Sequence, residues 1–111
     1  MPMPADVPLQ VYRGDSHAWR FRVWTDESHS VAFDLTEASV AAQIRRGPDV
    51  PFAVDLACEV EPPNVVTVRL DAAASQRTPI GVWDMQASWS DGRVVTLAAG
   101  KVDTTADVTR D

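Results

Sequence analysis

The chain has 111 residues, of which 45% are hydrophobic and 23% are charged. That length predicts a single domain with one core, and that composition argues against a disordered chain. The net charge of −6 argues against a nucleic-acid partner, because nucleic-acid-binding surfaces carry a basic stripe that attracts phosphates. The first residues lack the basic and apolar regions of a signal peptide, and no apolar run approaches membrane-spanning length, so we expect neither a secretion signal nor a membrane partner.

Residues 1–8 predict an extended N-terminal arm, because they show no apolar periodicity and several of them are prolines, which lack a backbone N–H. Arms of this kind often become ordered against a neighbouring protein. The candidate protein contacts in the arm are Pro2, Pro4 and Pro8. We expect a single domain over residues 9–105 and a polar tail over residues 106–111.

Short segments of alternating apolar and polar residues recur through the rest of the chain, at a spacing of roughly ten residues that is typical of a β-sandwich or barrel. Strands are expected over residues 9–12, 17–25, 31–33, 39–46, 52–60, 65–70, 81–89 and 93–105.

Two sequences predict turns between these strands. Arg13-Gly14-Asp15 predicts a structural turn rather than an integrin ligand, because glycine and aspartate adopt the backbone conformations that turns require. Asp91-Gly92 stands between two alternating runs and predicts the turn of a β-hairpin.

Two less regular features are also expected. Residues 71–77 form an alanine-rich piece after an aspartate, which predicts one short helical turn. Gly100 interrupts the last strand and predicts a bulge or kink there.

The apolar faces of the expected strands predict the core, because every second residue of a strand points to the same side. The candidate core residues are Trp19, Phe21, Val23, Ile44, Cys58, Trp83, Met85 and Trp89. Cys58 is the chain's one cysteine, so it cannot form an intrachain disulfide, and a buried structural thiol in a reducing cytoplasm is the expected role.

Trp24 falls on the opposite strand face from Trp19, Phe21 and Val23, between arginines and polar residues. Two interpretations are open. Its ring packs on an arginine of the same domain, or it lies in a protein interface, which makes Trp24 a further candidate protein contact.

No group of residues predicts catalysis. His17 and His29 have no further histidine or cysteine at metal-ligand spacing, so no metal site is expected. The chain also lacks the G-x-S-x-G sequence of a nucleophile elbow. The prediction is a domain that is not an enzyme and has no catalytic residues, cofactor or metal.

Six short motifs occur in an order that matches a known module. They are residues 12–16 (YRGDS), 33–36 (FDLT), 43–45 (QIR), 81–85 (GVWDM), 100–102 (GKV) and 107–110 (DVTR). In the order and spacing of these motifs, the chain from residue 9 onward resembles the N-terminal β-sandwich domain of baseplate upper proteins and of related minor tail and tail-fibre proteins of tailed bacteriophages.

The resemblance implies an immunoglobulin-like antiparallel β-sandwich of about seven to eight strands. It also implies docking onto other phage structural proteins, several copies in the assembled particle, and a location in the virion after assembly in the host cytoplasm, without catalysis or a cofactor. By position, the turn at residues 13–15 matches the family's first turn, and Ile44-Arg45 matches the end of its second strand. Trp83-Asp84 matches the start of the family's hairpin, where tyrosine is commoner than the tryptophan found here. A tail-tip or baseplate adaptor is the predicted function.

Two other functions stay open. A capsid decoration or head-to-tail connector protein would share these properties. A carbohydrate-binding sandwich is an alternative of another class, in which Trp24 and Trp89 would stack on sugar rings.

Overall fold

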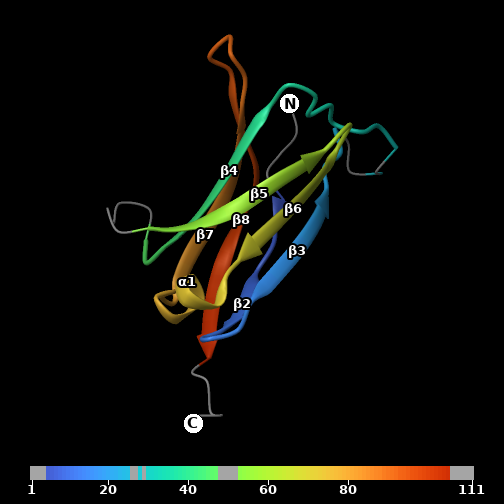
Figure 1. The fold of residues 1–111 in the computed structure, drawn as a ribbon. Helices are drawn as coiled ribbons and strands as arrows, with labels where there is room; N and C mark the ends of the chain where they lie inside the picture. The colour runs from blue at the N-terminus through green and yellow to red at the C-terminus, as the bar shows by residue number, and fades with distance from the viewer. Residues whose placement is uncertain (1–4, 26–27, 29, 48–52, 106–111) are drawn as a thin grey trace.

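The structure is a computed structural model that describes residues 5–25, 28, 30–47 and 53–105, and Figure 1 shows its fold. This part of the chain consists of β-strands and one short helix, so the predicted all-β class is confirmed. The strands are β1 (Ala5–Asp6), β2 (Leu9–Tyr12), β3 (His17–Arg22), β4 (Ser39–Arg45), β5 (Val54–Glu61), β6 (Val65–Leu70), β7 (Gly81–Ser88) and β8 (Val94–Thr105). The helix α1 (Ala72–Gln76) connects β6 to β7.

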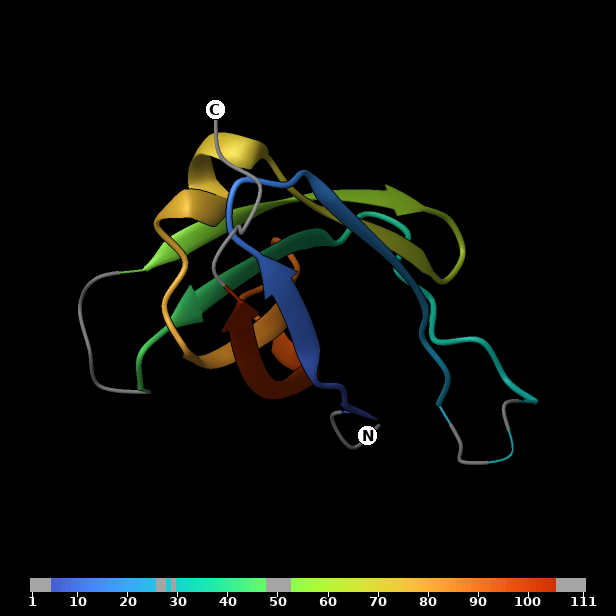
Figure 2. The same cartoon turned by 90° about the horizontal axis from the view of Figure 1, so that it is seen from below.

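The strands form one sheet that curls around the core (Figure 2). Its order is β1-β8-β7-β4-β5-β6-β3, and β2 also pairs with β8. β1 and β2 run parallel to β8, whereas all other neighbouring strands are antiparallel. β5 joins the two parts of the sheet, because residues 54–56 pair with β4 and residues 57–61 pair with β6.

The curled sheet is not closed by a ladder between β2 and β3 in the part of the chain that the structure describes. The turn at residues 13–15 connects these two strands, and the His17 Nε2 atom lies 3.2 Å from both the backbone N and the carbonyl O of Tyr12. A barrel without edges would need a continuous ladder at this position. β3 therefore forms one edge of the sheet, and the N-terminal strands form the other.

The core lies inside the curl, and each strand buries alternate residues because successive side chains point to opposite faces. Of the predicted core residues, Val23, Ile44, Trp83 and Met85 are buried. Trp19, Phe21, Cys58 and Trp89 are partly buried and pack against the core.

The strand expected over residues 17–25 ends earlier, at Arg22. The next residue, Val23, donates its N–H to the carbonyl oxygen of Asn64 at 2.9 Å but accepts a hydrogen bond from the Phe33 N–H at 3.0 Å. The segment expected as a strand over residues 31–33 therefore forms only one isolated bridge, between Trp24 and Ala32. The regular ladder ends here because the Val23 carbonyl oxygen accepts hydrogen bonds from the Phe33 N–H and from the side-chain amide of Asn64.

Asp91 and Gly92, predicted as a hairpin turn, lie in the loop of residues 90–92 between β7 and β8. The Trp89 N–H donates to the Arg93 carbonyl at 3.0 Å and closes the loop. Gly92 has a φ of +92°, the left-handed conformation that a three-residue hairpin loop requires near its end. The Asp91 carboxylate accepts the Arg93 N–H at 2.9 Å.

The sequence predicted a bulge or kink at Gly100, but the irregularity in the β7–β8 ladder lies elsewhere. The register between the two strands shifts at Met85 and Gln86. Gly100 is regularly paired opposite Trp83. Its missing side chain makes room for the carbonyl group of Val7, which a Cβ atom at Gly100 would overlap. Glycine is required here by the close approach of the backbone between β1 and β2.

The sheet begins within the expected arm. β1 pairs with β8, and the Val7 N–H donates to the Ala99 carbonyl at 2.9 Å. Pro8 separates β1 from β2. Residues 1–4, with Pro2 and Pro4, and the tail at 106–111 lie outside the described residues.

The turn at residues 13–15 is held by the segment that contains α1. Gly14 has a φ of +95°, and its N–H donates to the buried Ser75 hydroxyl at 2.9 Å. The Arg13 Nε donates to the Thr78 carbonyl at 3.2 Å. Asp71, the N-cap of α1, accepts a backbone hydrogen bond that fixes the start of the helix.

Candidate protein-docking site

An open groove lies where the N-terminal strands, the start of β7 and the C-terminal part of β8 meet. Its volume is about 560 Å³. The lining side chains used below are those of Pro8, Arg46, Ile80, Val82, Lys101 and Asp103.

Strand register brings these residues together from distant parts of the sequence. Val82 on β7 pairs with Lys101 on β8 and with Arg45 on β4, immediately before Arg46. Ile80 precedes β7 and is 64% exposed. The groove thus combines an apolar floor with polar side chains from several segments.

The rim of the groove carries positive charge. Arg46 and Lys101 are exposed, and neither forms an ion pair with another residue that the structure describes. Asp103 is the carboxylate among the lining residues. The groove therefore places two cations and one carboxylate around its apolar side chains.

Of the groove residues, only Pro8 is among the protein contacts predicted from the sequence, whereas Ile80, Arg46 and Lys101 are not. Ile80 offered a signal, since it is a large apolar residue outside the alternating run that begins at Gly81. Trp24, the other described candidate, is half-buried at its bridge with Ala32 and does not line the groove.

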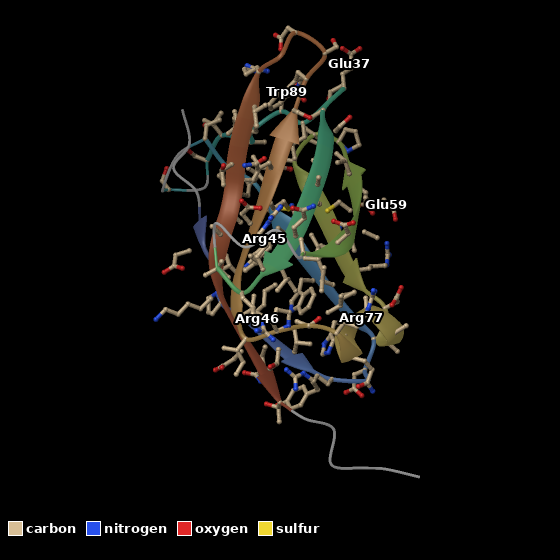
Figure 3. All side chains as sticks on the ribbon, turned by 90° about the vertical axis from the view of Figure 1, so that its left-hand side faces the viewer. Glu37, Arg45, Arg46, Glu59, Arg77 and Trp89 are labelled. Carbon is tan, nitrogen blue, oxygen red and sulfur yellow. The ribbon has the colours of Figure 1, made fainter. Side chains whose placement is uncertain are left out.

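An aromatic cluster lies near the β7–β8 loop. The Arg93 guanidinium is 4.1 Å from the centre of the Trp89 ring, and the Phe33 ring meets Trp89 edge-on with centroids 6.1 Å apart. Figure 3 shows Trp89 near one end of the molecule, with Arg46 near the other. The cluster is therefore separate from the groove, and a cation already covers a face of Trp89.

Two ion pairs cross the outer face of the sheet between β5, β6 and β3. Arg20 pairs with Glu61 at 3.1 Å, and Arg69 pairs with Glu59 at 2.9 Å. All four side chains are more than half exposed, so each pair contributes little to stability.

Among the residues that the structure describes, two titratable groups have clearly shifted pKa values. Asp34 is fully exposed, and hydrogen bonds from Thr36 lower its pKa. The larger effect comes from the Thr36 side chain and the smaller one from its backbone N–H. Burial raises the pKa of the Cys58 thiol and disfavours the thiolate.

The described residues contain no cluster of three or more His, Cys, Asp or Glu side chains placed to hold a metal ion. Within those same ranges, no helix is long and apolar enough to cross a membrane. Searches with family models and against curated protein sequences find no match to this chain.

Proposed function

We propose that this chain is a non-enzymatic structural protein of a bacteriophage particle, a β-module of the tail tip or baseplate that docks on neighbouring virion proteins in several copies. The phage assignment rests on the motif order from residue 12 to residue 110. The docking role is supported by the groove, where an exposed isoleucine is bordered by cations that have no ion pair among the described residues.

The immunoglobulin-like arrangement is part of this proposal. A seven-stranded immunoglobulin domain places strands A, B, E and D in one layer and C, F and G in the other. Here β3, β6 and β5 correspond in order to B, E and D, and β4, β7 and β8 correspond to C, F and G. Two features depart from that scheme: the first strands lie beside β8 rather than beside β3, and a ladder between β4 and β5 joins the two groups of strands into one sheet.

The surroundings of Trp89 argue against a sugar-binding site at that residue. A sugar-binding tryptophan needs a free ring face, whereas the Arg93 guanidinium lies over Trp89. Titration of the intrinsic tryptophan fluorescence with a panel of glycans should give no spectral shift. A saturable shift would favour the carbohydrate function instead.

Composition and imaging of particles test the virion role. In particles purified from the producing strain, quantitative mass spectrometry should find the chain at a fixed copy number, and electron microscopy of labelled particles should place it at the tail tip or baseplate. Label on the capsid or the neck would favour the decoration or connector alternative. Absence of the chain from particles would contradict the virion role.

A pair of variants tests the groove. Ile80→Asp should fold, because the side chain is 64% exposed, but should be lost from particles because it places a charge on the apolar floor. Val94→Asp is the matched control, since Val94 is 55% exposed and does not line the groove. Normal incorporation of Ile80→Asp would exclude the groove as the docking site.

A further inference from the structure

β3 is an edge strand whose open side can be defined residue by residue. Its six residues pair with β6, and no other strand among the described residues lies beside it. In an antiparallel ladder, the residues of one strand alternate between those that hydrogen-bond to the partner and those that face away from it. The ladder thus divides the backbone of β3 into two sets.

The hydrogen bond from the Val23 N–H to the Asn64 carbonyl, at 2.9 Å, shows which of the two sets of residues bonds to β6. In the register of β3 and β6, Val23 and Asn64 continue the ladder by one pair beyond Arg22 and Val65. Residues 17, 19 and 21 therefore direct their backbone groups toward β6. Ala18, Arg20 and Arg22 direct their N–H and carbonyl groups to the open side.

The inner face of β3 is incompletely covered along this edge. Trp19 and Phe21 are only partly buried, whereas Val68 and Val66, which pair with them on β6, have an exposed fraction of 0%. An additional strand beside β3 would cover both aromatic rings as β3 covers the valines. The edge thus offers apolar contacts together with backbone hydrogen bonds.

The outward side chains determine the charge of a suitable partner. Arg20 and Arg22 are exposed on the outer face of β3. Arg20 pairs with Glu61, but Arg22 has no ion pair with any residue in the described ranges. Pairing β3 with β3 of a second copy would place these arginines opposite or diagonal to each other, and like charges in such positions are destabilising. A second copy is therefore a poor occupant of this edge.

We propose that the open edge of β3 accepts an extended, acidic segment of a neighbouring protein as an added strand, in which carboxylates face Arg20 and Arg22. This proposal rests on the proposed docking role but not on the phage assignment. Together with the groove, it gives the module two separate docking surfaces, as an adaptor between two neighbours requires.

The first test uses the full chain and a synthetic probe. The probe is a capped peptide of sequence Thr-Glu-Val-Glu-Val-Glu-Thr, and its control has lysine in place of each glutamate. Amide hydrogen exchange measured by NMR should show new protection at Ala18, Arg20 and Arg22 with the acidic peptide, while Trp19 and Phe21, already bonded to β6, change little. Lack of protection at these three amides would overturn the proposal, and so would equal protection by the lysine peptide.

Variants separate edge pairing from nonspecific charge attraction. Arg22→Glu should weaken peptide binding about five- to tenfold, because an attractive cross-strand pair becomes repulsive. Arg77→Glu makes the same charge change at an exposed arginine after α1 and should leave binding unchanged. Equal weakening in both variants would overturn the proposal. Ala18→Pro removes one outward N–H without removing a bond to β6, so it should also weaken binding while the protein stays folded, as circular dichroism can verify.

These outcomes are distinguishable from failure of the proposed function. If the peptide binds as described but the chain is absent from phage particles, only the virion role fails. If the chain is incorporated at a fixed copy number but the peptide leaves β3 unprotected, only the β3 proposal fails.

Discussion

The indole Nε1 of Trp83 donates a 2.7 Å hydrogen bond to the backbone carbonyl oxygen of Val7, 76 residues earlier in the chain. Trp83 is 2% exposed, and its ring also stacks with Phe21 at a centroid distance of 5.7 Å. A single side chain of β7 thus contacts residues from both sides of the unclosed part of the sheet. The bond fastens the N-terminal segment to β7, at the point where Trp83 pairs with Gly100 of β8.

Trp83→Phe should therefore destabilise the protein by about 2 kcal/mol, because it removes the donor and leaves a carbonyl oxygen without its partner. The loss should be largest at the N-terminal segment, so amide exchange at Val7 should accelerate. Trp89→Phe is the control, since Trp89 is only partly buried, and its cost should stay below about 1 kcal/mol in urea unfolding. Unchanged exchange at Val7 in Trp83→Phe would show that the bond does not hold the segment.

Gly100→Ala should displace the N-terminal segment, because the added Cβ atom would overlap the Val7 carbonyl group. The expected cost is about 2 to 3 kcal/mol, as for overpacking elsewhere in protein cores. Gly92→Ala gives the comparison, because that glycine has a positive φ but open space around it, and should cost about 1 kcal/mol. Only Gly100→Ala should expose the amide of Val7 to exchange, and the same exposure in both variants would contradict this explanation.

Ser75→Ala should lower the free energy of unfolding by about 1 to 2 kcal/mol, because the Gly14 N–H loses its acceptor. Ser75 is fully buried, and its hydroxyl also donates to the Ala72 carbonyl at 2.9 Å. Ser16→Ala, at an exposed residue beside the same turn, should stay within about 0.5 kcal/mol of the parent chain. Equal urea midpoints for the two variants would argue against the contact between the turn and α1.

Glu37→Gly should stabilise the protein by about 0.5 to 1 kcal/mol. Glu37 is exposed and has a φ of +65°, which costs a residue with a Cβ atom more than it costs glycine. Glu37→Ala keeps the Cβ atom and removes the same charge, so it should give no such gain. Identical stability of the two variants would mean that the backbone conformation contributes no strain.

Partial burial should slow the reactions of the Cys58 thiol and make stability fall at alkaline pH. Because the folded state raises its pKa above the ordinary value of 9.0, the thiol contributes stability that is complete below that value and is lost as the pH rises through the folded pKa. Alkylation by iodoacetamide at pH 8 should be slower than for the same chain in denaturant. Cys58→Ala should remove this part of the alkaline decline, and an unchanged pH profile would contradict the assignment.

Local alternation was enough to predict much of the fold. The strands at Leu9–Tyr12 and Val65–Leu70 have the expected bounds, and the inward-facing residues Ile44 and Met85 are buried in the core. These features depend on side-chain periodicity within a single segment, which a sequence displays directly.

Features that depend on distant segments were not predicted. Nothing in residues 1–8 indicates that the Val7 carbonyl meets Gly100, and the glycine alone predicted a kink. The groove likewise joins Arg46, Ile80 and Lys101 through strand register, which no local pattern displays. The early end of β3 at Arg22 also follows from a bond to Phe33 that alternation cannot reveal.

The division of β5 between β4 and β6 has a consequence for unfolding. The backbone between Leu56 and Ala57 is the place where one ladder ends and the other begins. Detaching either half of the sheet would pull on a strand that the other half holds, so partial unfolding would break hydrogen bonds on both sides. The domain should accordingly unfold in one cooperative transition, with fluorescence and circular dichroism giving coincident curves.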